Sequence, residues 1–209
     1  LARALAPRPR VLLLDEPLSA LDAKVRVSLR NEIREIQREL GITAIFVTHD
    51  QEEAMSISDR IVVMNGGIAE QAGAPFEIYN NPRTRFVAGF VGTLNMFTAT
   101  VEVPEQGLLT VAGQRVSLTR GPIAARSGEV VTLALRPEAI QLGRAEGREV
   151  VIPATIEEVH FLGSVIRVRA RVMDTIVALD TFNRPDQPPP SIGSTAEISF
   201  SPRDVILLP

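Results

Sequence analysis

Two aliphatic runs on either side of an amphipathic segment place the tightest limit on how this chain can fold. Val11 to Leu14 and Thr43 to Val47 are continuously apolar or nearly so, which is typical of strands inside a parallel sheet. Between them, residues 24–40 carry apolar side chains at helical spacing, and Gly41 is a suitable helix end. This order predicts a parallel strand-helix-strand unit whose strands are buried on both faces.

The pattern changes near residue 92, where helical spacing gives way to short, alternating apolar runs. We therefore predict an α/β domain at residues 1–92 and an all-β domain, a small barrel or sandwich, at residues 93–209. The proline-rich segment 184–190 is predicted to be a surface loop. The expected strands of the second domain are Phe97 to Val103, Leu108 to Val111, Val116 to Leu118, Val130 to Leu135, Val151 to Val159, Val165 to Val172, Ile176 to Leu179, Ala196 to Phe200 and Val205 to Leu208.

Composition narrows the functional classes without naming one. The 209 residues have a formal net charge of −3 with no polybasic or acidic block, and no apolar run approaches the ~20 residues of a membrane-spanning helix. The sequence has no cysteine, which excludes disulfides and fits a reducing cytoplasm. Leu1 opens a helical-looking segment without an N-cap, so we expect that an upstream portion is absent.

The first candidate for catalysis is the Asp15-Glu16 pair at the end of the first aliphatic run. This is a Walker B pattern, in which Asp15 lies beside a nucleotide-bound Mg²⁺ and Glu16 polarises the water that attacks the γ-phosphate. The structural alternative is a buried strand that ends in two carboxylates to meet solvent or a helix N-terminus.

His49 lies at the end of the next aliphatic run. The crossover should bring it to the same edge of the sheet as Glu16, where open α/β folds bind their ligands. A histidine there can hydrogen-bond the γ-phosphate and hold the attacking water. Alternatively, His49 caps a helix and has a structural role only.

Three further features have a structural interpretation, and two of them have a functional one as well. Ser19 and Asp22 could simply begin the following helix. Arg167, Arg169 and Arg171 alternate along one strand, and they form either an anion site or, as we favour, a solvated strand face. His160 is interpreted as structural.

With these motifs in order, the sequence resembles ABC transporter ATPases over essentially its whole length. Four segments carry the resemblance. They resemble the helix after the signature motif (residues 1–6), Walker B (residues 14–17), the D-loop (residues 18–22) and the switch histidine (residues 47–51). Residues 74–79 and 83–92 resemble the end of that domain in bacterial importer subunits for sugars, polyamines and iron. Leu135-Arg136-Pro137-Glu138, residues 161–164 and residues 202–204 resemble the OB-like (TOBE) regulatory domain that follows it.

The sequence departs from that family where the nucleotide should be bound. A phosphate loop needs glycines followed by Lys and Ser or Thr. The single lysine is Lys24, which lies in the predicted helix, and the Gly-rich signature and Q-loop are also missing. We therefore identify a partial P-loop NTPase domain without its Walker A half, followed by an OB-like barrel, and expect the chain to be inactive alone.

The resemblance implies what the parent protein does. It would be an ATPase that uses ATP and Mg²⁺ and works as a homodimer. The dimer would be peripheral to the cytoplasmic face of the membrane and would lie beneath transmembrane permease subunits, which receive the solute from a solute-binding protein. Ser19 and Asp22 would then contact the phosphate loop of the partner subunit. The sequence character of the β domain favours a polyamine-type importer.

Two rival interpretations remain for the whole sequence. One is a non-catalytic regulatory module in which the β domain is the working part. The other is a nucleic-acid-associated ABC ATPase, although the sequence has no Trp and no basic surplus for binding nucleic acid.

Overall fold

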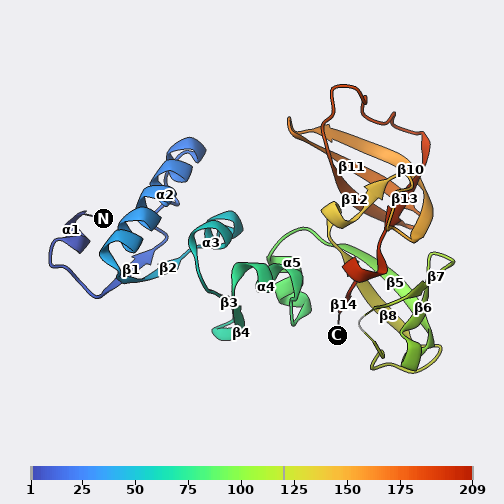
Figure 1. Cartoon of the computed structure of the whole chain (residues 1–209), viewed down its shortest axis with the longest axis horizontal. Helices are drawn as coiled ribbons and strands as arrows, with labels where there is room; N and C mark the ends of the chain where they lie inside the picture. The colour runs from blue at the N-terminus through green and yellow to red at the C-terminus, as the bar shows by residue number, and fades with distance from the viewer. Residues whose placement is uncertain (1, 120, 209) are drawn as a thin grey trace. The chain divides into compact units, whose positions relative to one another are not determined.

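The computed structural model describes residues 2–119 and 121–208, and the chain divides between Arg83 and Thr84 into two compact units (Figure 1). This division precedes the 92/93 boundary expected from the sequence. The reason is helix α5 (Arg85–Phe90), whose Ala88 packs in a buried cluster with Ala134, Ile206 and Leu208 of the second unit.

The first unit contains the predicted crossover. Strands β1 and β2 pair in parallel, with Asp15 opposite Val47, and α2 connects them and ends at Gly41, whose φ is 61°. In the hairpin that follows, both turn residues have positive φ, 54° at Gly66 and 83° at Gly67. The elements are α1 (Ala2–Leu5), β1 (Val11–Asp15), α2 (Ala23–Leu40), β2 (Thr43–Val47), α3 (Gln51–Ile57), β3 (Ile61–Asn65), β4 (Ile68–Gly73) and α4 (Pro75–Asn80). The expected helix at residues 1–6 is described from Ala2 onward, and Leu1 lies outside the described residues.

Helix α2 covers only one face of the β1–β2 pair. Leu18, Ile33 and Ile57 are buried there, and Leu14 and Phe46 from the strands pack against them and are partly buried. On the other face, four strand side chains are at least half exposed: Val11 at 51%, Leu13 at 70%, Ile45 at 54% and Val47 at 50%. The prediction that these strands are buried on both faces is therefore wrong for the described structure, because a single helical layer packs on them.

Each of the nine expected strands of the second unit is present. Strand β9 was not predicted, because its two residues form too short a pattern to recognise. The elements after α5 are β5 (Asn95–Val103), η1 (Pro104–Gln106), β6 (Leu108–Val111), β7 (Gln114–Ser117), β8 (Val130–Leu135), η2 (Pro137–Ala139), β9 (Gln141–Leu142), β10 (Val150–Phe161), β11 (Val165–Val172), β12 (Thr175–Phe182), β13 (Thr195–Phe200), η3 (Pro202–Asp204) and β14 (Ile206–Leu208).

These strands form two antiparallel five-stranded sheets that share one apolar core. Their orders are β12-β11-β10-β13-β9 and β14-β8-β5-β6-β7 (Figure 1). Phe97 and Phe200, one from each sheet, lie with ring centroids 6.2 Å apart. The buried Asn95 side chain joins the sheets as well, since it donates to the Ala178 carbonyl at 2.7 Å and accepts from the Ala178 amide at 2.6 Å. The α/β plus all-β fold class predicted from the sequence is confirmed.

Candidate active site

The site lies where β1 and β2 end side by side. The Glu16 amide donates to the Val47 carbonyl at 3.0 Å, which continues the parallel pairing one residue beyond β1. Glu16 itself has a φ of 43°, in the left-handed region that a side chain seldom adopts. Such backbone is concentrated at functional sites and turns, because the surrounding structure must hold it in place.

The crossover brings Glu16 and His49 together, as the sequence predicted. The His49 Nδ1 lies 3.4 Å from Glu16 Oε1. Both groups are accessible, since the side chains are 73% exposed at His49 and 49% exposed at Glu16. The pair therefore presents a carboxylate and an imidazole to solvent from two neighbouring strand ends, which is the placement that acid–base chemistry on a bound substrate requires.

Asp15 is also exposed at the end of β1, next to Glu16 in the chain. Within the described residues, no group of three or more His, Cys, Asp or Glu side chains could hold a metal ion. Asp15 alone fits a Mg²⁺ ion that takes its other oxygen ligands from water and from a substrate's phosphates, as is usual for this ion.

Ser19 and Asp22 make local contacts in the turn between β1 and α2. The Ser19 hydroxyl donates to the Glu16 carbonyl at 3.0 Å. The Asp22 carboxylate caps α2, accepting from the amides of Lys24 at 3.1 Å and Val25 at 3.0 Å. The helix-start interpretation of Asp22 is thus confirmed, while the contact of either residue across a dimer stays a prediction.

A polar cluster behind His49 was missed by the sequence analysis. Asp50 caps α3 by accepting from the Glu53 amide at 3.1 Å, and its own amide donates to the Thr48 hydroxyl at 3.0 Å. This capping lowers the pKa of Asp50, and the nearby Arg26 guanidinium lowers it further, against an opposing effect of burial. The signal in the sequence was Asp-x-x-Glu after an aliphatic strand, a capping-box pattern.

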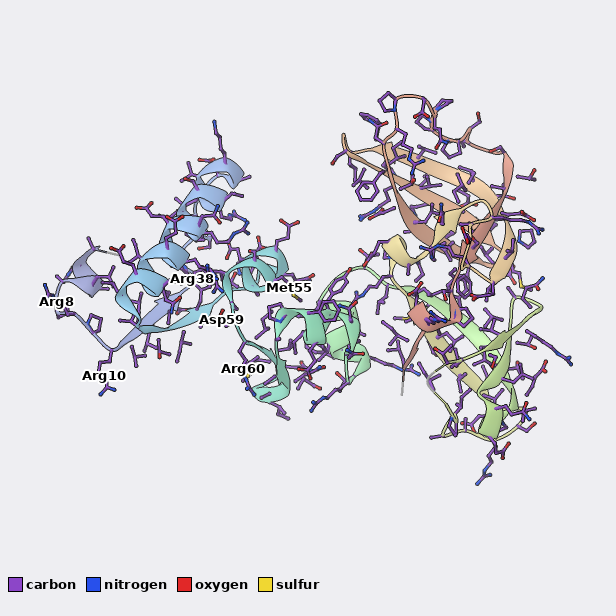
Figure 2. The ribbon with its side chains drawn as sticks, viewed as in Figure 1. Arg8, Arg10, Arg38, Met55, Asp59 and Arg60 are labelled. Carbon is purple, nitrogen blue, oxygen red and sulfur yellow. The ribbon has the colours of Figure 1, made fainter. Side chains whose placement is uncertain are left out.

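An ion pair also connects α2 with the C-terminal end of α3. Arg34 donates to Asp59 at 2.6 Å and also to the Ile57 carbonyl. Asp59, labelled in Figure 2, follows the helix. Its pKa is lowered by the hydrogen bond from Arg34. Helix α3 is therefore held at both ends by arginines of α2.

The arginine row of β11 is neutralised by its neighbours. Arg167 makes a bidentate pair with Asp180 at 2.8 Å, Arg169 contacts Glu158 at 3.2 Å, and Arg171 contacts Glu157 at 2.5 Å. The hydrogen bonds that Arg167 donates to Asp180 raise the pKa of Arg167. These contacts favour the charged strand face over an anion site.

His160 belongs to the same set of contacts. Its Nε2 lies 3.0 Å from Glu158 Oε2, and this interaction lowers the pKa of Glu158. The local pairing fits the structural role expected from the sequence.

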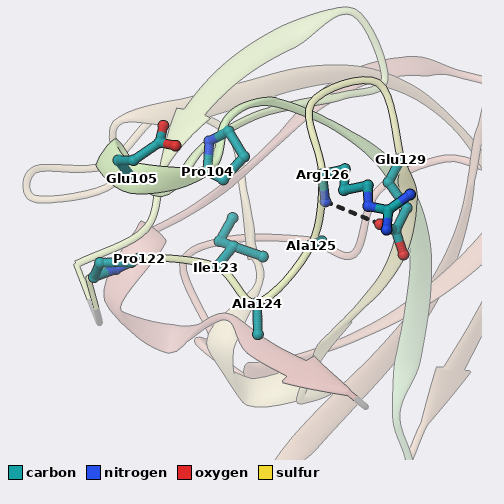
Figure 3. Close-up of a pocket in the computed structure, with 8 residues that line it drawn as sticks. All are labelled: Pro104, Glu105, Pro122, Ile123, Ala124, Ala125, Arg126 and Glu129. Carbon is teal, nitrogen blue, oxygen red and sulfur yellow. Dashed lines mark hydrogen bonds between the residues drawn. The ribbon is translucent and has the colours of Figure 1, made fainter.

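The second unit also has an open depression of about 460 Å³ (Figure 3). Half of its lining residues are proline or alanine, and one polar contact within it joins the Arg126 amide to Glu129 at 2.9 Å. The lining residues are Pro104, Glu105, Pro122, Ile123, Ala124, Ala125, Arg126 and Glu129. With its carboxylates on an open surface, the depression lacks the enclosed, convergent polar groups of a small-molecule site.

A parallel-sheet edge with an exposed Asp-Glu pair and a facing histidine, joined to an all-β unit, is the class of arrangement found in nucleotide-hydrolysing proteins with an appended β domain. Sequence comparison is consistent with this class. Residues 133–208 match the TOBE domain family. No helix within the described residues has the length and apolar character needed to cross a membrane.

Three curated relatives show what the chain as a whole is similar to. A spermidine/putrescine import ATP-binding protein, PotA, of Pseudomonas fluorescens is 45% identical over 96% of this chain and 55% of its own length. The PotA of Thermobifida fusca is 42% identical over 100% of this chain and 56% of its own length. An Fe(3+) ions import ATP-binding protein, FbpC 2, of Rhizobium meliloti is 49% identical over 81% of this chain and 45% of its own length.

The chain is therefore a homologue of the ATP-binding subunits of ABC importers, with a TOBE domain in its C-terminal region. It spans about half the length of the curated relatives it matches. A solved structure of the cytoplasmic molybdate-binding protein ModG aligns with 55% of this chain and 96% of its own, at 14% identity and a TM-score of 0.45. That likeness is too distant to bear on this chain's ligands.

Proposed function

We propose that the protein to which these residues belong hydrolyses ATP to drive import of a solute across the cytoplasmic membrane. The observation that carries this proposal is the 3.4 Å contact between Glu16 and His49 at the ends of two parallel strands. The chain that contains these strands is 42–49% identical to three proteins named as import ATP-binding proteins.

Each site residue has a distinct role in this proposal. Asp15 would hold a Mg²⁺ ion, which when bound would offset negative charge on the phosphates of ATP. Glu16 would accept a proton from the attacking water, and its half-exposed carboxylate can be reached by that water. His49 would donate a hydrogen bond toward the phosphate and fix the water between itself and Glu16.

A second copy of the subunit would complete the site. The exposure of Glu16 and His49 leaves their outer side open to another surface, and Ser19 and Asp22 lie in the adjoining turn. In the proposed dimer these two residues face the partner's phosphate loop. The subunits would work on the cytoplasmic side beneath transmembrane permease subunits, which a solute-binding protein supplies.

We propose a polyamine as the solute. Several relatives carry the name spermidine/putrescine import ATP-binding protein. Relatives named for iron and for sulfate or thiosulfate import are each 49% identical, so the family as a whole spans several solutes. Uptake of labelled spermidine, iron and sulfate by cells with and without the intact gene would test the choice.

The two parts of the chain would divide the work. Residues 1–92 would contribute metal, base and switch groups of an ATPase domain, and residues 93–209 would regulate it. Without a Gly-Lys phosphate loop in its sequence, the 209-residue chain by itself should neither bind Mg-ATP measurably nor release phosphate. Calorimetric titration of Mg-ATP into this chain tests that statement, and micromolar binding would contradict it.

The decisive test of the catalytic proposal is Glu16→Gln in the protein encoded by the full natural reading frame. Removing a positioned base should lower kcat by ~100-fold or more while ATP binding is retained. Glu52→Gln is the matched control, since Glu52 is an exposed glutamate of α3 outside the site, and it should keep kcat within about twofold. A Glu16→Gln enzyme with kcat within tenfold of the natural protein would remove Glu16 from the role of base.

A further inference from the structure

Arg26 makes three contacts that connect the 18–22 turn with the residues after His49, and none of the three is to His49 itself. From the first turns of α2, its Nη2 donates to the Leu21 carbonyl at 3.0 Å and its Nη1 donates to the Asp50 carboxylate at 3.1 Å. Its Nε lies 3.6 Å from Glu53 Oε1. The planar, rigid guanidinium can hold three such partners at once in a fixed relation, which an ammonium on a flexible chain cannot.

The burial of Glu53 makes this arrangement costly to lose. The Glu53 side chain is 4% exposed, against 31% for Arg26. A buried carboxylate is strongly unfavourable unless it is paired and hydrogen-bonded. Glu53 meets both conditions, because one oxygen faces Arg26 and the other accepts from the Thr48 hydroxyl at 2.6 Å.

The residues on either side of His49 are thereby fixed. Thr48 is tied to Glu53, and Asp50 is tied to Arg26 and to the start of α3. His49 itself is 73% exposed and contacts Glu16, so its position depends on the backbone that its two neighbours hold. The third Arg26 contact, to Leu21, attaches the same group to the 18–22 turn that carries Ser19 and Asp22.

We propose that Arg26, acting through Glu53 and Asp50, is a positioning residue that holds His49 against Glu16 and couples it to the 18–22 turn. A displacement of that turn is transmitted to the His49 loop through the guanidinium. This inference rests on the proposed role of His49 in hydrolysis, and it adds a residue that acts on His49 through Glu53 and Asp50 and lies outside the Glu16–His49 pair.

A double-mutant cycle on the protein encoded by the full natural reading frame tests the proposal. Arg26→Ala should lower kcat by about 10- to 100-fold, the range expected when a catalytic group is misplaced. The KM for ATP should change less than twofold. In a His49→Ala background, Arg26→Ala should produce no further loss beyond about twofold, since both substitutions remove the same function.

The control and the second variant keep the result interpretable. Arg38→Ala is the same chemical change on the same helix at an exposed position, labelled in Figure 2, and it should leave kcat unchanged. If Arg26→Ala unfolds the protein, Arg26→Lys takes its place in the test. This variant retains a cation beside Glu53 but loses the planar set of N–H donors of the guanidinium, and it should show a smaller kcat loss with the same dependence on His49.

A spectroscopic measurement separates this proposal from the proposed function. The His49 imidazole resonances should move or broaden in Arg26→Ala, while those of His160, in the other unit, stay in place. An unmoved His49 signal, or kcat losses that multiply in the double variant, would overturn the positioning role. The two proposals can fail separately. If His49→Ala leaves kcat intact, the catalytic role of His49 is wrong. If the His49 resonances still move in the Arg26→Ala variant, the positioning of His49 by Arg26 stands.

Discussion

The two compact units differ in how completely they bury their own strands. In the second unit, alternate residues of β5 such as Phe97, Ala99 and Val101 are at most 4% exposed, within a core shared by two sheets. In the first, the outward residues of β1 and β2 are 50–70% exposed. An alternating strand needs one apolar layer and finds it in the facing sheet, whereas a continuously apolar strand needs two and here has only α2.

The largest consequence concerns independent folding. We expect residues 84–209 alone to unfold in one cooperative transition with dispersed proton NMR signals, while residues 1–83 alone show neither. A shorter segment, residues 93–209, should fold with a lower midpoint, because it loses the packing of Ala88 on Ala134 and Ile206. Circular dichroism melts of the three segments provide the comparison, and a cooperative transition in residues 1–83 would remove the contrast between the units.

The next largest effect should come from the core of the second unit. Phe200 is 1% exposed and packs near Phe97, so Phe200→Ala should lower the free energy of unfolding by about 3–5 kcal/mol. Phe182 is 77% exposed in the same unit and serves as the matched control. Phe182→Ala should change stability by less than about 0.5 kcal/mol in the same urea titration, and similar losses for the two variants would mean that the shared core is not formed.

A smaller effect is expected at the start of α2 in the first unit. Asp22→Ala removes the acceptor of two amides and should cost about 1 kcal/mol, whereas Asp22→Asn keeps a capping oxygen and should cost little. Measuring both the midpoint and kcat separates the two roles proposed for Asp22. Normal stability with reduced turnover in Asp22→Asn points to contact with a partner, and normal values for both leave it a helix cap.

The smallest stability change should occur at the uncovered sheet face. Leu13 is 70% exposed, so Leu13→Thr in the 209-residue chain should shift stability by no more than about 0.5 kcal/mol while reducing self-association seen by light scattering. Its neighbour Leu12 is 4% exposed, and Leu12→Thr should destabilise several times more. Unchanged scattering in Leu13→Thr would show that this face does not drive association.

Much of the molecule follows from short-range patterns in the sequence. The α2 span, its Gly41 end and nine strands of the second unit were predicted because periodicity, caps and turn residues act over a few neighbouring positions. The proximity of Glu16 and His49 also followed, since consecutive parallel strands place their carboxyl ends at one edge.

Other features depended on contacts between distant residues, which no local pattern encodes. The sequence could not show that Arg26 reaches Asp50 and Glu53, because those side chains meet only after α2 and α3 pack together. Likewise, the partners of Arg167 and Arg169 were set by the strand register of the second unit. Local sequence determined which elements form and which residues end them, and tertiary packing decided which charges meet and which faces stay open, because charge pairing and burial depend on groups brought together across long stretches of chain.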